Sequence, residues 1–464
     1  TRSPLGSRGL GDVYKRQVNM KFKIPYHHIT VLMLGVLLLT ACDASQTTPI
    51  PVTNTVKRAP TDMPMVKPTD TPTAEPTATP TDIPTAEPTN TPMATNTPTA
   101  GPAGEINNLD KDKAAAIEAL FSDYIDRIRL TGLAVGIVLQ NEIVYARGFG
   151  VRNSDTQEPV TAESLFHMAS VSKPFVATGI MQLVEQGKID LDEPVVTYLP
   201  YFKLADERYQ QITIQQILSH VSGMPDVMGE YGWDQPEYDD QALERYVRSL
   251  EDREMLLNPG DEFSYSNMAY EVMGDVIAKV SGQSFEEYMQ ENIFTPLEME
   301  TSTFFKPDVP PELETSPHNI SGSVSEVYPY NRAHAPSSTL HSNVLEMANW
   351  AIANMNRGAF NGERILQESS YDLLWKPYIQ ISDERSIGLS WFIGTLGDQY
   401  RIFHGGADVG FRSMFVMLPD ESSAVIVLAN NERADPRVMV EQVLEIILEN
   451  EPEIVLTHIH EHTP

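Results

Sequence analysis

The amino-acid sequence predicts an α+β fold, with an antiparallel sheet built from both ends of one domain and a mostly helical subdomain inserted between them. Strand-like apolar runs occur at 133–139 and 143–149, and again at 400–404, 411–418 and 424–428. Between these two groups the apolar residues recur mainly at helical spacing. Because strands that flank a run of helices can pair in one sheet, we expect a cleft between the sheet and the inserted helices.

The flanking elements follow from their residue spacing. Residues 111–130 carry apolar side chains at helical intervals and predict an amphipathic helix. The first two strands meet at Gln140-Asn141-Glu142, which predicts a hairpin. Residues 212–220 and 239–252 are predicted to be helical, and residues 437–448 form a closing helix.

Composition restricts the classes of function. Of 464 residues, 64 are acidic and 33 are basic, so the net charge is −31. A surplus of this sign repels phosphate backbones, and we expect no nucleic-acid partner. The sequence contains no phosphate-binding glycine loop, no paired-cysteine metal site and no Gly-x-Ser-x-Gly element, so we expect no cofactor and no α/β-hydrolase nucleophile.

The N-terminal region has the features of a targeting signal. Residues 1–19 include a stretch that resembles a translated sequencing adapter, and we exclude them from the fold and place the start at Met20. Residues 20–41 combine a short basic region with an apolar run, as in a signal peptide. The run ends at Leu39-Thr40-Ala41-Cys42, which resembles the lipobox of bacterial lipoproteins.

Cys42 is the only cysteine of the chain, which excludes a disulfide within it. We expect Cys42 to be lipidated and to hold the protein on the bacterial cell envelope, outside the cytoplasm. An ordinary signal peptide with an accidental cysteine, or an uncleaved anchor, are the alternatives.

Two segments are predicted to lie outside the folded domain. Residues 42–104 are rich in Thr and Pro, with a proline at every fourth position from 60 to 92, which is typical of a disordered tether. Fully extended, it would reach roughly 150 to 180 Å. The catalytic domain is predicted at 105–450 and a flexible tail at 451–464, where His458, His460 and His462 indicate either a solvated tail or a metal site.

The first candidate catalytic element is Ser170-Val171-Ser172-Lys173, at the start of a predicted helix. Pro174 is tolerated in the first turn of such a helix. Residues three apart share a helix face, so the Ser170 hydroxyl and the Lys173 amine should point into the same volume. That arrangement suits a serine nucleophile beside its base. The alternative is an N-cap serine with a solvated lysine.

The second candidate element is Tyr265-Ser266-Asn267, which follows a turn at Pro259-Gly260. Residues two apart in an extended segment project to one side, so Tyr265 and Asn267 can enter one cleft. A phenol can transfer a proton there and an amide can hold a carbonyl group. A turn asparagine beside a tyrosine at the core edge is the alternative.

The third element is His404-Gly405-Gly406-Ala407, at the end of a predicted strand. Glycines at a cleft edge let substrate approach the backbone, and an exposed N–H could complete an oxyanion hole with the N–H of Ser170. Glycines in a strand can also mark only a bulge or a hairpin turn.

Together, Ser-x-x-Lys, Tyr-x-Asn and His-Gly-Gly resemble the serine β-lactamase and penicillin-binding-protein superfamily. The resemblance is strongest to the branch with class C β-lactamases, D-alanyl-D-alanine carboxypeptidases, D-aminopeptidases and related esterases. It runs from about residue 115 to 448 and includes the flanking segments 166–169, 214–225 and 259–267. It implies a β-lactamase/transpeptidase-like fold and a serine hydrolase that works through an acyl-enzyme.

Carried over to this chain, the resemblance implies the roles of the site residues. Ser170 would be the acylated nucleophile, Lys173 and Tyr265 the proton-transfer pair, and Asn267 a positioning group. Lys173 can act as base only if burial or nearby positive charge lowers its pKa; otherwise Tyr265 must take the proton. The sequence leaves this choice open.

The resemblance also implies the substrate-binding residues. His404, Gly405 and Gly406 would replace a Lys-Thr-Gly strand motif, and Ala407 would donate the second oxyanion N–H. The β-lactam-hydrolysing members usually carry lysine where this chain has His404, and a neutral imidazole binds a carboxylate poorly.

We therefore expect hydrolysis of an ester, an amide or a D-amino-acid peptide, with a small molecule or peptide as substrate. A non-catalytic cell-wall peptide receptor and a true β-lactamase are the alternatives. Arg412 could replace the missing lysine as a carboxylate partner, although a surface arginine on a strand is the simpler interpretation.

Overall fold

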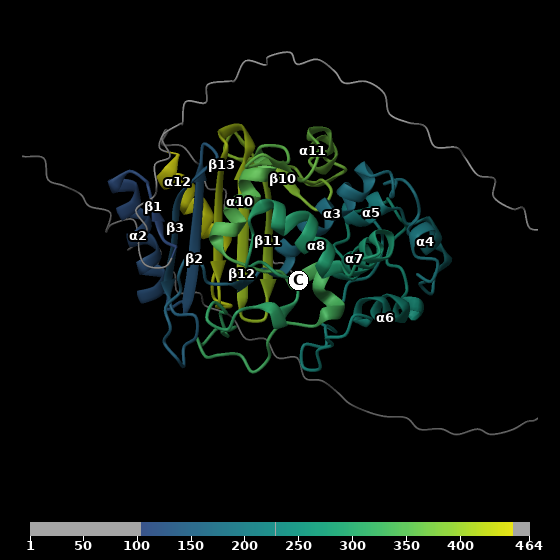
Figure 1. Ribbon diagram of the computed structural model, residues 1–464, viewed down its shortest axis with the longest axis horizontal. Coiled ribbons are helices and arrows are strands. Elements are labelled where there is room, and N and C mark those ends of the chain that lie inside the picture. Colours follow the sequence, from purple (N-terminus) through teal and green to yellow (C-terminus); the bar gives the residue numbers. More distant parts are fainter. Residues whose placement is uncertain (1–103, 228, 449–464) are drawn as a thin grey trace, which may run out of the picture. The chain divides into compact units, whose positions relative to one another are not determined.

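A nine-stranded antiparallel sheet forms the centre of the computed structural model, which describes residues 104–227 and 229–448 (Figure 1). Its strand order is β1-β3-β2-β13-β12-β11-β10-β9-β8. The strands are β1 (Ile106–Asn107), β2 (Gly132–Leu139), β3 (Glu142–Gly150), β8 (Ile379–Ser382), β9 (Arg385–Ile387), β10 (Phe392–Leu396), β11 (Gln399–Asp408), β12 (Phe411–Leu418) and β13 (Ser423–Ala429). Strands from the two ends of the domain meet where β2 pairs with β13, so the predicted α+β fold is confirmed.

Several predictions concern residues outside the described ranges. They include the signal peptide, lipidation of Cys42, the tether up to residue 103 and the histidine-containing tail. Among the described residues, no helix combines the length and the apolar character that crossing a membrane requires.

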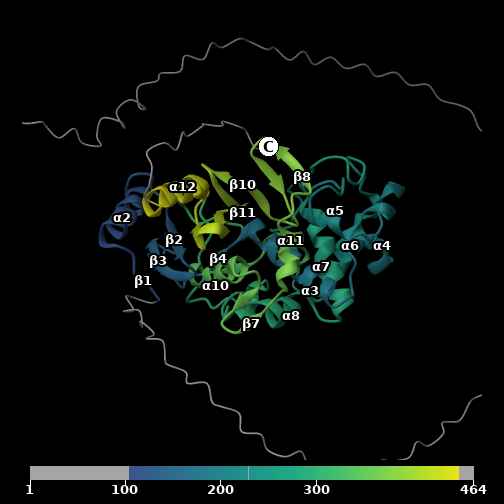
Figure 2. The same cartoon turned by 90° about the horizontal axis from the view of Figure 1, so that it is seen from above.

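The sheet has a helical layer on each face. Side chains alternate between the two faces of a strand, so Leu133 and Val135 of β2 pack with α2 (Lys111–Asp126) and α12 (Pro436–Ile447). Ala134 and Val138 belong to the other face, which is covered by α10 (Val344–Met355). Figure 2 shows α12 and α10 on opposite sides of the sheet.

The inserted helical region lies beside the second face and contains the other helices. They are α3 (Lys173–Glu185), α4 (Val195–Tyr198), α5 (Ile214–Leu218), α6 (Ala242–Arg248), α7 (Asn267–Ser281), α8 (Phe285–Met289), α9 (Ala335–Ser338) and α11 (Glu368–Leu374). Helix α3 is buried along most of its length.

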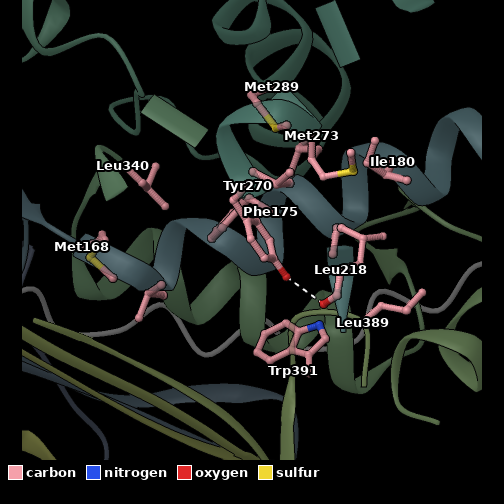
Figure 3. Packing of buried hydrophobic residues seen from close by; sticks show 14 of the residues in the cluster. Met168, Phe175, Ile180, Leu218, Tyr270, Met273, Met289, Leu340, Leu389 and Trp391 are labelled. Carbon is pink, nitrogen blue, oxygen red and sulfur yellow. Dashed lines mark hydrogen bonds between the residues drawn. The ribbon is translucent and has the colours of Figure 1, made fainter. Parts of the chain in front are cut away.

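Phe175 anchors α3. Its ring stacks on Trp350 of α10, with ring centroids 4.0 Å apart. Figure 3 shows Phe175 and Ile180 of α3 next to Tyr270 and Met273 of α7. Helix α3 is therefore held between the sheet layer and the inserted helices, which fixes the position of its N-terminus.

Most predicted elements are present with shifted ends. The first predicted helix ends at Asp126 rather than at residue 130, and Arg129 has a positive φ of 60°, a conformation that does not continue a helix. The helix predicted at 212–220 covers only Ile214–Leu218. Thr213 and Gln216 form a capping box at its start, and His220, with φ 54°, lies beyond its end.

Two further differences have local causes. The helix predicted at 239–252 divides into α6 and a 3₁₀ turn at Ser249–Asp252. The short strands β8 to β10, at one end of the sheet, were not predicted, because each has five residues or fewer and little alternation. The same holds for the two-residue pairs β4 (Phe166–His167) with β5 (His341–Ser342) and β6 (Ala359–Phe360) with β7 (Glu363–Arg364).

Candidate active site

Ser170 lies in a 3₁₀ turn, Ala169–Ser172, that leads directly into α3. The sequence predicted it in the first α-helical turn, so it lies one short turn further upstream. Ala169 has a φ of 48° although it is buried, a conformation that costs about 1–3 kcal/mol for a residue with a side chain. The Ser172 hydroxyl stabilises the turn by accepting from the Leu340 N–H at 3.1 Å. The turn leaves Ser170 partly exposed between buried neighbours.

The Lys173 side chain is fully buried and makes three hydrogen bonds. Its Nζ lies 3.1 Å from Ser170 Oγ, 2.5 Å from Asn267 Oδ1 and 2.9 Å from the Ser337 carbonyl oxygen. Three acceptors match the three protons of an ammonium group. When the amine is neutral, its lone pair can instead accept the Ser170 proton across the same distance.

Burial lowers the pKa of Lys173 to about 7, from an ordinary value above 10. Three carboxylates, Glu271, Asp226 and Asp408, act in the opposite direction and raise the pKa in part. A substantial fraction of Lys173 is therefore uncharged near neutral pH. The lowered pKa is what Lys173 needs in order to act as the base.

Tyr265 lies over the same amine. Its ring centroid is 5.0 Å from Lys173 Nζ, and its ring stacks on His220 with centroids 4.2 Å apart. Desolvation raises the pKa of Tyr265 well above its usual value, and a hydrogen bond to Ser170 offsets this in part. The phenol is therefore protonated at neutral pH and can donate a proton.

Asn267 is the first residue of α7, directly after an extended Ser266 at φ −144°. Ser266 caps the helix by accepting from the Ala269 N–H at 3.1 Å. Helix α7 is also tied to α5 by the Tyr270 hydroxyl, which donates to the Leu218 carbonyl oxygen at 2.8 Å (Figure 3). Asn267 Oδ1 and the Tyr265 ring both lie at Lys173 Nζ, so the two residues share one site, although Asn267 already belongs to the helix and not to the extended segment that the sequence predicted.

His404 is buried on β11, and its Nδ1 lies 2.7 Å from the Gly405 carbonyl oxygen. Because a carbonyl only accepts, Nδ1 carries the proton and Nε2 is an acceptor. Burial, reinforced by the charge of Lys173, lowers the pKa of His404 to about 3. His404 is therefore neutral, and it is not a substitute for a charged lysine at this position.

The backbone of β11 passes close to the residues that precede Ser170. A Cβ at Gly406 would lie 2.3 Å from the Met168 carbonyl oxygen, so only glycine fits. The pairing of β11 with β12 runs through both glycines without a register shift, which argues against a bulge. Ala407 follows at the exposed end of the strand.

Arg412 lies opposite Ala407 on β12. Its guanidinium donates to the carbonyl oxygens of Asp408 at 2.6 Å and Phe411 at 2.7 Å. The structure therefore places Arg412 in contact with backbone at the turn between β11 and β12.

Sequence reasoning missed the partners of the lysine. Ser337 contributes a backbone carbonyl, for which residue type gives no signal. Glu271 is fully buried and accepts from the Ser337 N–H at 3.2 Å. A charged residue inside the apolar pattern of a helix was the available signal for Glu271. The described residues contain no group of three or more His, Cys, Asp or Glu side chains arranged to hold a metal.

Comparison with known proteins agrees with this geometry. Residues 117–446 match the family model described as Beta-lactamase, and the chain belongs to that family. Protein flp of Staphylococcus aureus (strain MW2) is 25% identical over 326 residues, which cover 69% of this chain and 64% of that protein. Penicillin-binding protein 4* of Bacillus subtilis (strain 168) is 24% identical over 343 residues, which cover 70% of this chain and 73% of that protein.

A solved structure supports the same assignment. The octameric penicillin-binding protein homologue from Pyrococcus abyssi aligns with a TM-score of 0.64 at 26% sequence identity. The alignment covers 72% of this chain and 77% of that chain. The β-lactamase/transpeptidase-like fold is thus confirmed, and members of the family are serine hydrolases.

The contact between β11 and the nucleophile turn can be tested at Gly406. Gly406→Ala places a methyl group against the Met168 carbonyl and should displace the turn, so we expect the rate of Ser170 labelling by a fluorophosphonate to fall about 100-fold. Gly187→Ala is the control for a general loss of stability, because its new methyl group meets nothing within 4 Å while its φ of 67° strains the backbone of an alanine. Equal labelling rates in the two variants would show that this contact does not position Ser170.

Proposed function

We propose that this protein is a serine hydrolase that forms an acyl-enzyme on Ser170. The observation that carries the proposal is the Ser170 hydroxyl 3.1 Å from a buried lysine amine whose pKa lies near neutrality. A nucleophilic serine needs a base in hydrogen-bonding reach, and a general base is most effective when its pKa is near the working pH. The family assignment supports hydrolysis as the reaction class.

The proposed acylation moves one proton and exchanges one bond. Neutral Lys173 takes the proton of Ser170 Oγ while that oxygen attacks the substrate carbonyl carbon. The N–H groups of Ser170 and Ala407 would stabilise the oxyanion. Collapse of the intermediate expels the leaving group, which receives a proton from Tyr265, and Tyr265 recovers it from Lys173. Water then repeats the sequence on the acyl-enzyme and releases the acid.

The charges around the site favour a substrate without a carboxylate near the scissile bond. His404 is neutral, and Arg412 donates to backbone carbonyl oxygens. Three carboxylates, by contrast, act electrostatically on Lys173. Neutral esters and amides, including D-amino-acid derivatives, therefore fit the site better than carboxylate-bearing β-lactams.

We also propose that the enzyme works outside the cytoplasm, on the bacterial cell envelope. This part of the proposal depends on the lipobox-like Leu39-Thr40-Ala41-Cys42 and the Thr/Pro-rich spacer that follows it. Metabolic labelling with an alkyne fatty acid, compared with Cys42→Ala, tests the anchor.

The nucleophile is tested by substituting Ser170. Ser170→Ala should abolish fluorophosphonate labelling and hydrolysis of p-nitrophenyl butyrate, because it removes the oxygen that is acylated. Ser249→Ala, at an exposed serine in the turn after α6 whose hydroxyl bonds only the Tyr246 carbonyl oxygen, should keep both. A Ser170→Ala protein that still turns over the ester would contradict the proposal, and tight peptide binding without product would favour a receptor.

The lysine makes a specific prediction for pH dependence. Only the neutral amine can accept a proton, and its fraction increases as pH rises through about 7. We therefore expect kcat/KM to increase between pH 5.5 and 7 and to level off above pH 8. A profile that rises only above pH 9 would mean that Lys173 keeps an ordinary pKa.

Substrate charge is tested with a matched pair of peptides. Acyl-D-alanyl-D-alanine and its C-terminal amide differ by one carboxylate, and we expect the amide to be cleaved about 10- to 100-fold faster, because the neutral His404 offers the carboxylate no charged partner. His404→Lys should reduce this difference. Faster cleavage of the free acid by the wild-type protein would refute the predicted preference.

A further inference from the structure

Asp226 lies in the loop after α5 and binds Asn267 at several atoms. One of its carboxylate oxygens, Oδ1, accepts from the Asn267 backbone N–H at 2.8 Å and from its side-chain Nδ2 at 3.0 Å. The other, Oδ2, lies 3.3 Å from the same Nδ2. The carboxylate is half-buried, and its Oδ1 also accepts from the Val227 N–H at 2.8 Å. It therefore holds both the backbone and the amide end of Asn267.

This contact determines which way the Asn267 amide faces. An amide has a donor end and an acceptor end, whereas an ionised carboxylate only accepts. Rotating the amide by half a turn would place its oxygen against Asp226 and its NH₂ group against the Lys173 ammonium. Both contacts would then be repulsive. Asp226 thus selects the orientation in which Asn267 Oδ1 faces Lys173 Nζ at 2.5 Å.

We propose that Asp226 is a positioning residue for the catalytic lysine, which acts by fixing the amide of Asn267 that holds the Lys173 amine next to Ser170. This inference rests on the proposed serine hydrolase function. Asp226 touches neither Ser170 nor Lys173 in a hydrogen bond among the described residues, and it acts through Asn267.

A purely structural role is the simplest competing explanation. Asp226 accepts from the N–H of the first residue of α7, which would stabilise the start of that helix. The start of α7 already has a cap, however, because the Ser266 hydroxyl accepts from the Ala269 N–H. Helix stability alone also does not explain why Asp226 binds the side-chain Nδ2 of Asn267.

The proposal has a second consequence, through charge. Asp226 is one of the carboxylates that favour the protonated form of Lys173. The ionisable groups that act on Lys173 or face it come from several elements; they are Glu271, Asp226, Asp408, His220, His404, Tyr265 and Tyr270. Burial lowers the pKa of Lys173, and the Asp226 charge raises it in part. Without that charge, Lys173 should lose its proton at a lower pH than in the wild type.

Two substitutions separate position from charge. Asp226→Asn keeps an acceptor oxygen but removes the charge, and Asp226→Glu keeps the charge but moves the oxygens. For p-nitrophenyl butyrate we expect both to lower kcat by about 10- to 100-fold with little change in KM. Asp226→Asn should also shift the acid limb of the kcat profile to lower pH, and Asp226→Glu should shift it less. Glu230→Gln, an exposed carboxylate of the same loop paired with Arg253, is the control and should match the wild type.

A readout independent of turnover distinguishes this inference from the proposed function. In protein carrying ¹³Cε-labelled lysine, the NMR titration midpoint of Lys173 should fall in Asp226→Asn and remain unchanged in Glu230→Gln. If the wild type shows no Ser170-dependent hydrolysis, the proposed function fails, while the titration still shows whether Asp226 acts on Lys173. Asp226 variants with lower melting temperatures but wild-type kcat and an unchanged Lys173 titration would reduce Asp226 to a helix-stabilising residue and overturn the inference.

Discussion

The burial of one amine is the constraint on which the rest of the site depends. Lys173 is the only lysine among the fully buried side chains of the described residues, and removing an ammonium from water costs several kcal/mol unless it is paired or loses its proton. In this site the Lys173 amine is hydrogen-bonded and also loses its proton more easily than an exposed lysine. Three acceptors surround the amine, and its pKa is lowered to about 7. The same burial that weakens the charged form makes the lysine a usable base.

The architecture provides the rigidity that this arrangement requires. The three acceptors come from separate elements, because Ser170 precedes α3, Asn267 begins α7 and Ser337 belongs to α9. Phe175 fixes α3 against the helix that covers the sheet, and Gly406 lets β11 approach the nucleophile turn. Packing over much of the domain therefore positions the Lys173 amine. The strained Ala169 precedes Ser170 in the turn that leaves Ser170 partly exposed.

The sequence alone could predict features that depend on the spacing of nearby residues. A strand-like apolar run located β12 with its observed ends, and the three-residue spacing placed Ser170 beside Lys173. It could not predict contacts made through backbone atoms, such as the Ser337 carbonyl, or a carboxylate that acts through another side chain, such as Asp226. Whether Lys173 has the required pKa was also open, because burial is set by elements far apart in the chain.

The most direct test of this account is the protonation of Lys173 itself, followed by NMR in protein with ¹³Cε-labelled lysine and assigned by comparison with Lys173→Arg. We expect a titration midpoint near pH 7 for Lys173 in the folded protein. A lysine that remains charged until above pH 10 would contradict it, since such an amine could not accept the Ser170 proton at neutral pH.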